Sequence, residues 1–313
     1  MLDDKCMYQV FHIDQYPLPL PPGHRFPHTK YALLRELLLR EEIVLPAQLQ
    51  LAPMADFDLL SLAHSADYIR AMENGTVAID IIKRVGFPWT PELFRRTSAT
   101  VGGGVEAALS ALKYGVAGCL AGGTHHAHFD RGEGYCVFND TAVAARLLVR
   151  DHQIKRIAII DLDVHQGNGN SSILGRDQEI FIASIHGEKN YPFRKVPSSI
   201  DIGLPDGATD EMYLEALETV MREVSRFEPE FIFYQMGVDP LKEDKLGKLS
   251  LTYDGLMARD EIVLQYAKDH AIPISLALGG GYADPIELSI RAYANTYKVL
   301  NRVWYKRSHE GLS

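Results

Sequence analysis

Four glycine-rich or acidic segments of this sequence carry side chains that suit hydrolytic chemistry at a metal ion. They are residues 122–126 (GGTHH), 161–165 (DLDVH), 237–240 (GVDP) and 279–282 (GGGY). Each one follows a short apolar run that is typical of a buried strand. The carboxyl ends of parallel strands lie along one edge of a sheet, where ligands bind. We therefore expect the four segments to meet in one crevice.

Residues 161–165 predict a metal site. Side chains alternate along an extended chain, so Asp161, Asp163 and His165 share one side. Two buried carboxylates and an imidazole would repel and lose hydration unless a cation neutralised them. With Asp239 from another strand end, Asp163 and His165 form an Asp2His set that leaves a fourth position open, as catalytic zinc sites require. Taken alone, the aspartates could instead end a strand or cap a turn, and the other three segments favour the metal.

The paired histidines and the glycine-flanked tyrosine supply the remaining groups for hydrolysis. One of His125 and His126 can remove a proton from metal-bound water, while the other, held by a carboxylate such as Asp161, stays cationic or donates a hydrogen bond. Tyr282 follows three glycines that permit a tight turn. Its hydroxyl is a suitable donor to a developing oxyanion. A single histidine or tyrosine is more often structural, and the position after a strand end is what favours function here.

The elements that must position these groups alternate in the manner of a wound parallel α/β sheet. Asn139, Thr209 and Asp284 are suited to cap the starts of three helices. The prolines of residues 17–23 predict an extended surface loop. Residues 102–104 follow no strand and residues 167–169 lack a P-loop lysine, so both predict permissive turns rather than phosphate loops. Strands are predicted over 116–121, 156–161, 179–185, 230–236 and 273–278, and helices over 30–42, 64–74, 92–114, 140–151, 210–227, 253–270 and 284–303.

Size and composition bound the interpretation. A chain of 313 residues without a composition break predicts one catalytic domain over 1–313. A net charge of −9 argues against nucleic acid or an anionic membrane as partner, and weakly favours a neutral or cationic substrate. Three cysteines without CxxC spacing predict neither disulfides nor a thiolate zinc site. The polar residues 1–15 resemble neither a signal peptide nor a membrane span, so a cytoplasmic location is expected.

The motifs together resemble the zinc-dependent histone deacetylase family. The resemblance covers most of the chain in family order. Gln166, Asn168 and residues 244–250 are more similar to class IV enzymes and their bacterial relatives than to class I, which suggests a bacterial origin. The segments that carry it are 122–127 (GGTHHA), 132–140 (GEGYCVFND), 161–169 (DLDVHQGNG), 237–240 and 279–282.

This resemblance implies an arginase-like three-layer α/β fold, with a central, mostly parallel sheet flanked by helices, and removal of an acyl group from an amine. It implies that Asp163, His165 and Asp239 bind one zinc ion. His126 would act as general base and acid. His125, paired with Asp161, would give electrostatic support, and Tyr282 would polarise the carbonyl.

The resemblance also suggests a substrate pocket and a second ion. Gly134, Tyr135 and Gly280 would line the pocket with Tyr191 and Phe193. A structural potassium ion is expected near Asp161, Asp163, His165 and Ser184.

Two departures from the family pattern carry consequences. Asn168 stands where many relatives have an aspartate, so the working pKa of His126 should be lower. Residues 87–90 (FPWT) offer no rim aspartate to grip a peptide backbone. Strict peptide recognition is therefore not predicted.

The substrate and the class of protein have alternatives. Acetyl-lysine in proteins, longer acyl-lysines and acetylated polyamines all present the same amide, so an acetylpolyamine amidohydrolase of the same family is one alternative. A binuclear manganese ureohydrolase is another, although residues 161–165 supply only one histidine. A catalytically silent module that binds acyl-lysine is a third. The sequence assigns no oligomeric state.

Overall fold

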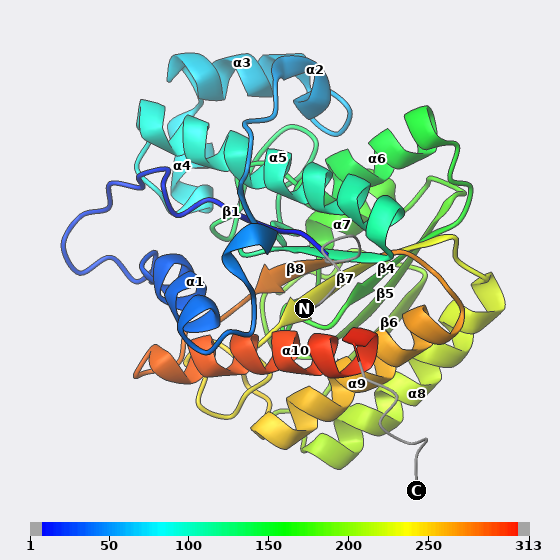
Figure 1. Ribbon diagram of the computed structural model, residues 1–313. Coiled ribbons are helices and arrows are strands. Elements are labelled where there is room, and N and C mark those ends of the chain that lie inside the picture. The colour runs from blue at the N-terminus through cyan, green and yellow to red at the C-terminus, as the bar shows by residue number, and fades with distance from the viewer. Residues whose placement is uncertain (1–7, 306–313) are drawn as a thin grey trace, which may run out of the picture.

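The computed structural model describes residues 8–305 and places helices on both faces of a single parallel sheet (Figure 1). Within that range, eight strands pair in the order β2-β1-β3-β8-β7-β4-β5-β6, and each neighbouring pair is parallel. The strands are β1 (Val10–His12), β2 (Leu49–Leu51), β3 (Val116–Cys119), β4 (Ile157–Asp161), β5 (Ile180–Gly187), β6 (Ile200–Leu204), β7 (Phe231–Gly237) and β8 (Ile274–Gly279).

The helices form the two outer layers. On one side of the sheet lie α1 (Lys30–Arg40), α8 (Asp210–Phe227), α9 (Tyr253–Asp269) and α10 (Glu287–Tyr305). On the other side lie α2 (Phe57–Leu60), α3 (Ala66–Asn74), α4 (Ile79–Val85), α5 (Pro91–Tyr114), α6 (Asp140–His152) and α7 (Asn168–Leu174). A short 3-10 turn, η1 (Pro46–Gln48), precedes β2.

The central strands are apolar on both faces because each face packs against a helical layer. In β4, Ile157 and Ile159 join the core under α5 and α6, while Ala158 and Ile160 join the core over α8 and α9. Strand β7 alternates in the same way. Continuous apolar runs are what a sheet buried on both sides requires. The predicted three-layer α/β fold is confirmed.

The predicted elements are present, with ends shifted by a few residues. All five predicted strands and all seven predicted helices occur among the described residues. Strands β1, β2 and β6 and helices α2, α4 and α7 were not predicted. Most of these elements have three to seven residues, which is too short to show a clear period. No helix in residues 8–305 has the length and apolar character needed to cross a membrane.

The three predicted helix caps have different outcomes. The Asn139 side chain accepts a hydrogen bond from Ala142 N at 2.8 Å, which confirms it as the cap of α6. Thr209 occupies the capping position of α8 without a side-chain capping bond. The prediction for Asp284 was wrong, because α10 begins at Glu287 and Asp284 pairs with Lys245 instead. The residue before a proline avoids helical geometry, and Pro285 follows Asp284.

The glycines predicted to form turns are helical. Residues 102–104 lie in the middle of α5, and residues 168–169 begin α7, so both turn predictions were wrong. A Cβ on Gly102 would stand 1.9 Å from Pro53 O. The glycine therefore allows α5 to pack directly against the backbone of the segment that follows β2. The proline-rich loop is irregular, as predicted.

Candidate active site

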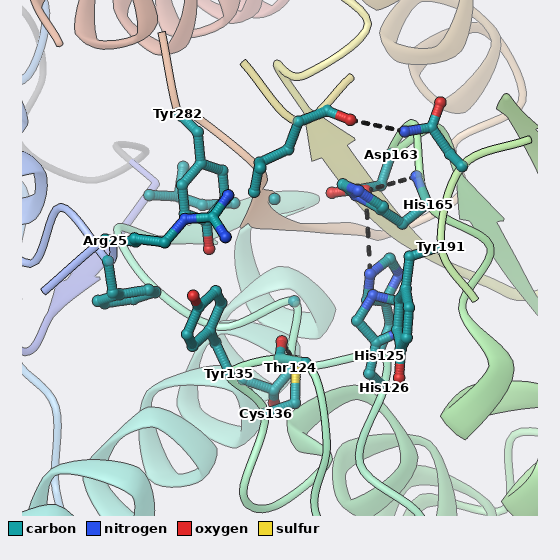
Figure 2. Close-up of a pocket in the computed structure, with 18 of the residues that line it drawn as sticks. Arg25, Thr124, His125, His126, Tyr135, Cys136, Asp163, His165, Tyr191 and Tyr282 are labelled. Atoms are coloured by element: carbon teal, nitrogen blue, oxygen red, sulfur yellow. Dashed lines mark hydrogen bonds and ion pairs between the residues drawn. The ribbon is translucent and has the colours of Figure 1, made fainter. Parts of the chain in front are cut away.

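Three of the four predicted segments, residues 122–126, 161–165 and 279–282, contribute to the lining of one pocket (Figure 2), and Asp239 of the fourth lies 3.1 Å from His165 Nδ1 without lining the pocket itself. The cavity has a volume of about 450 Å³. His125 and His126 come from the loop after β3, His165 follows β4, and Tyr282 follows β8. Together with β7, these strands are consecutive in the sheet, in the order β3-β8-β7-β4. The predicted convergence is confirmed.

Asp163, His165 and Asp239 form a compact cluster on the wall of this pocket. The Nδ1 atom of His165 lies 3.0 Å from Asp163 Oδ1 and 3.1 Å from Asp239 Oδ2. One donor atom from each residue lies within 4.8 Å of the other two. Asp163 and Asp239 are buried, with exposed fractions of 1% and 0%. Among the described residues, no other group of three His, Cys, Asp or Glu side chains converges in this way.

Charge repulsion within the cluster shows why a cation suits it. Burial raises the pKa of Asp239 to about 7, and the Asp163 carboxylate adds to that rise. Burial alone would lower the pKa of His165, yet its bonds to Asp163 and Asp239 raise it to about 10. The protonated His165 thus supplies positive charge that stabilises the Asp163 and Asp239 carboxylates, and a bound cation would do the same.

The donor set fits a zinc ion. Imidazole nitrogen and carboxylate oxygen both bind zinc at about 2.0–2.2 Å, and a tetrahedron of such bonds separates ligand atoms by about 3.3 Å. The separations from His165 Nδ1 are 3.0 and 3.1 Å, so little movement is needed to admit an ion. Three protein donors also leave a fourth position for water or substrate.

His125 is paired with Asp161, as predicted. The His125 Nδ1 to Asp161 Oδ2 distance is 2.7 Å, and both residues are buried. Burial would lower the pKa of His125, but the Asp161 and Asp163 carboxylates raise it to about 9. His125 is therefore cationic at neutral pH, which agrees with the predicted electrostatic role.

His126 is held by an amide and, beyond it, by a carboxylate. The His126 Nδ1 hydrogen bonds Asn168 Oδ1 at 2.7 Å. On its other side, Asn168 Nδ2 donates to Glu133 Oε1 at 2.7 Å. Burial lowers the pKa of His126 well below its usual value, and the neighbouring His125 and His165 lower it further. The hydrogen bond to Asn168 acts in the opposite direction and raises the pKa of His126, so the predicted effect of an amide in place of an aspartate stays a prediction.

Glu133 collects hydrogen bonds in addition to that from Asn168. Tyr191 OH donates to its Oε1 atom at 2.7 Å, and His128 Nε2 lies 3.4 Å from the same oxygen. Burial would raise the pKa of Glu133, but the bonds from His128, Tyr191 and Asn168 lower it to about 2. A carboxylate therefore stands two hydrogen bonds from the imidazole of His126.

Tyr282 enters the pocket with a free hydroxyl. Its backbone N–H donates to Asp244 Oδ2 at 2.7 Å, and its ring stacks 6.1 Å from that of Tyr135. Figure 2 shows both phenols directed into the cavity. Within residues 8–305 the Tyr282 hydroxyl has no hydrogen-bond partner, and burial raises its pKa well above 10. The hydroxyl stays protonated and can donate to a substrate.

The residues predicted to bind substrate are also brought together. Gly134, Tyr135, Tyr191, Phe193 and Gly280 all line the cavity. Gly280 has a φ of +63°, and a Cβ there would lie 2.2 Å from Asp239 Cγ, so only glycine fits beside this ligand.

One further prediction concerns Ser184, which does not line the pocket. Ser184 pairs with Asp161 in the β4–β5 ladder, and its hydroxyl bonds His186 Nδ1 at 3.0 Å. The potassium site near Ser184 stays a prediction. Cys136 is buried in the lining of the pocket, and that burial raises the pKa of its thiol.

The sequence reasoning missed Lys30, which is 3% exposed on the floor of the pocket. Its Nζ donates to Gly280 O and lies 4.9 Å from the centre of the Tyr282 ring. Burial lowers the pKa of Lys30 to about 8, against the raising effect of Asp244 and Asp239. A readable signal existed, because Lys30 shares the buried stripe of α1 with Leu34 and Leu38.

Arg25 and Glu133 were also missed. Arg25 comes from the proline-rich loop and reaches over the pocket (Figure 2). Glu133 lies within residues 132–140, but its hydrogen-bond partners Asn168 and Tyr191 come from distant segments. No residue pattern near Arg25 indicates its position at the pocket.

The chain is similar over most of its length to proteins of known family. Residues 24–298 match the family model described as histone deacetylase domain. An uncharacterized protein of Picosynechococcus sp. is 40% identical over 296 residues, which are 94% of this chain and 98% of that protein. Histone deacetylase 2 of Arabidopsis thaliana is 32% identical over 257 residues, 78% of this chain and 65% of that protein.

Solved structures share the fold. The structure of a histone deacetylase (HDAC) homolog complexed with SAHA superposes with a TM-score of 0.80 at 26% identity, and covers 95% of this chain and 84% of that one. The acetylpolyamine aminohydrolase of Burkholderia pseudomallei superposes with a TM-score of 0.77 at 19% identity, over 95% of this chain and 99% of that one. At 19% identity the second similarity concerns the fold alone.

Proposed function

This chain belongs to the histone deacetylase family, and on that premise we propose that it is a zinc-dependent deacylase that hydrolyses the amide of an acyl-lysine or an acylated amine. One observation carries the proposal. The buried cluster of Asp163, His165 and Asp239 opens onto the same pocket as a neutral histidine, His126, and a protonated phenol, Tyr282.

The ion and the side chains have separate tasks. When bound by the three ligands, zinc supplies a Lewis acid that polarises a carbonyl and lowers the pKa of a water to about 7. His126 presents Nε2 to that water, because its Nδ1 hydrogen is committed to Asn168 Oδ1. Its lowered pKa keeps the ring neutral, and therefore able to accept a proton.

Hydrolysis then needs one bond to form and one to break. The water oxygen attacks the amide carbon, and the water proton passes to His126 Nε2. The Tyr282 hydroxyl donates a hydrogen bond to the developing oxyanion. The carbon–nitrogen bond breaks as His126 returns the proton to the amine nitrogen. The products are a carboxylic acid and an amine, and His126 is neutral again. The acid then loses its proton to the amine or to solvent, which leaves a carboxylate and an ammonium ion at neutral pH.

His125 takes no proton in this sequence. It already carries one, since its pKa is raised to about 9 by Asp161 and Asp163. The centres of the His125 and His126 rings lie 4.1 Å apart, so the positive charge of His125 favours the neutral form of His126. His125 thus tunes the base rather than acting as one.

Two variants test these roles. Asp163→Ala should lose both zinc and turnover of an acetyl-lysine peptide. Tyr282→Phe should keep zinc and fold but lose about 10²- to 10³-fold in kcat, as removal of an oxyanion donor does. Tyr114→Phe, at the end of α5 and outside the pocket, is the matched control. Full activity of the Tyr282→Phe protein would refute the role given to that hydroxyl.

The alternatives make different predictions in the same assays. A binuclear manganese ureohydrolase would bind two ions per chain, whereas the one converging cluster among the described residues predicts one. A silent acyl-lysine binding module would bind the peptide without turnover. An acetylpolyamine amidohydrolase would prefer acetylspermidine to every acyl-lysine peptide.

A further inference from the structure

Basic side chains gather at the mouth of the pocket although the whole chain carries a net charge of −9. Arg25, Arg84, Lys189 and Lys248 all line the cavity and are exposed. Among the lining residues that the structure describes, Asp163 is the sole carboxylate, and it lies at the metal cluster. The charge of the entrance is therefore opposite to that of the protein.

Arg25 and Arg84 are held at one side of the entrance by the backbone around them. His24 Nε2 bonds Gly86 O at 2.9 Å, which joins the Arg25 loop to the end of α4. Arg84 O accepts from Gly134 N at 3.0 Å, so Arg84 is fixed to the pocket wall. Within residues 8–305 neither guanidinium has an ion pair or a hydrogen bond, so both charges are free to meet a ligand.

Lys189 and Lys248 are brought together by a buried amide. Asn190, only 3% exposed, donates from Nδ2 to Leu246 O at 2.7 Å. Its Oδ1 accepts from Lys248 N at 3.2 Å, which joins the two loops that carry the lysines. For the described part of the chain, the nearest carboxylate oxygen to Lys189 Nζ belongs to exposed Asp206, at 3.9 Å. Such an exposed pair is weak.

The two basic pairs come from different segments of the chain and line the same cavity as Asp163 and His165. Figure 2 shows Arg25 and Tyr135 on one side of the pocket and Tyr191 on the other. Lys189 precedes Tyr191 by two residues. Because these four basic residues are exposed and Asp163 is buried in the same cavity, a substrate that enters from solvent meets the basic side chains before its amide reaches Asp163. Clefts lined by one sign of charge concentrate ligands of the opposite sign.

We propose that the entrance selects acyl-lysine in an acidic peptide segment and disfavours acylated polyamines. This inference rests on the proposed deacylase function. Carboxylates beside the acyl-lysine would face Arg25, Arg84, Lys189 and Lys248. The ammonium groups of a polyamine would face the same four cations without a carboxylate to offset them. The local charge therefore reverses the substrate preference that the net charge of the chain favours.

The test compares substrates that share one acetyl-lysine. Three peptides carry Asp, Ala or Lys on both sides of it, and acetylspermidine is the fourth substrate. We expect kcat/KM for the Asp-flanked peptide to exceed that for the Lys-flanked peptide and for acetylspermidine by about tenfold or more in low salt. The difference should shrink towards unity between about 20 mM and about 500 mM salt, because added ions screen exposed charges.

Charge reversal locates the effect. The double variant Arg25→Glu, Arg84→Glu should invert the ratio between the Asp-flanked and Lys-flanked peptides. The matched control is Lys113→Glu, Arg222→Glu, which changes the net charge equally at exposed positions on α5 and α8 that do not line the pocket. This control should retain the wild-type ratio.

The outcomes separate the inference from the proposed function. Turnover of the Ala-flanked peptide without any preference for Asp over Lys, or a preference for acetylspermidine, would overturn the inference alone. A ratio that both double variants change equally would also overturn it, since the entrance would then have no special part. Absence of turnover of all four substrates by zinc-loaded protein would overturn both.

Discussion

Replacing Glu133 should slow the reaction without disturbing the metal. This carboxylate does not itself line the pocket and lies behind Tyr191, whose hydroxyl hydrogen it accepts, and it also accepts the Nδ2 hydrogen of Asn168 at 2.7 Å. That bond forces the Asn168 oxygen towards His126 Nδ1. If the amide inverts, its nitrogen faces His126 and the imidazole must carry its proton on Nε2. A ring in that form cannot accept a proton from water.

The size of the expected loss in kcat follows from the strength of the hydrogen bond from Asn168 Nδ2 to Glu133, which orients the amide. A hydrogen bond to a charged group contributes about 1.5–3 kcal/mol, and each 1.4 kcal/mol is tenfold in an equilibrium. After Glu133 is lost, Asn168 Nδ2 still has one possible hydrogen-bond partner, His128 Nε2, at 3.2 Å. We expect kcat of Glu133→Ala to fall about 10- to 100-fold, with KM changed little.

The assay measures kcat, KM, zinc content and the midpoint of urea unfolding for each variant. Glu133→Gln keeps an oxygen acceptor for Asn168 and Tyr191 but removes the charge, so its loss of kcat should be smaller than that of Glu133→Ala. Zinc content should match wild type in both. A merely structural role would lower the unfolding midpoint and leave kcat of the folded fraction unchanged.

A double variant gives the sharpest test. In an Asn168→Asp background, Glu133 would face a carboxylate instead of an amide, and the two like charges would repel. Glu133→Gln should therefore raise kcat in that background, whereas it lowers kcat in the wild type. Wild-type kcat in Glu133→Ala, or the same sign of effect in both backgrounds, would refute the reasoning.

Three other predictions concern stability. Chelation should lower Tm, and zinc at a hundredfold excess over its Kd should restore about 2.7 kcal/mol, whereas Asp163→Ala should show no response to either treatment. Arg259 is buried with Asp260 and donates to Gly237 O at 2.6 Å. Arg259→Met should lower the free energy of unfolding, measured with urea, by about 3–5 kcal/mol. The exposed control Arg226→Met should lower it by less than about 1 kcal/mol. His64 donates to His128 O and accepts from Asn139 N, and burial lowers its pKa to about 4. Below about pH 6.5 the unfolded chain therefore binds a proton on His64 that the folded protein does not bind. The free energy of unfolding should be at its full value above pH 6.5 and fall by up to about 3 kcal/mol towards pH 4. His64→Gln should flatten that decline, and an unchanged slope would contradict the assignment.

Local patterns were enough to predict the strand ends and the meeting of Asp163, His165 and Asp239. Apolar runs of four to eight residues mark buried strands, and parallel strands place their carboxyl ends on one edge. The side-chain alternation of residues 161–165 then directs Asp163 and His165 away from the buried Leu162 and Val164. Each of these inferences uses residues adjacent in the chain or a general rule of sheet topology.

Local patterns failed for short elements and for caps that compete with other interactions. A strand of three residues such as β1 has no measurable period. Asp284 has a capping side chain, but Pro285 delays the helix and Lys245 takes the carboxylate. Gly102 looked like a turn residue, and its actual requirement is the 1.9 Å that would separate a Cβ from Pro53 O.

Tertiary structure alone decided which distant side chains each functional group contacts. Glu133 meets Asn168 and Tyr191 across 35 and 58 residues of chain. The basic entrance arises because His24 binds the end of α4 and Asn190 joins two loops. Periodicity and capping act within a few residues, whereas these distances depend on how whole layers pack. The sequence therefore determined the chemistry that this chain carries to the sheet edge, and packing decided the orientation of its base and the charge that a substrate meets first.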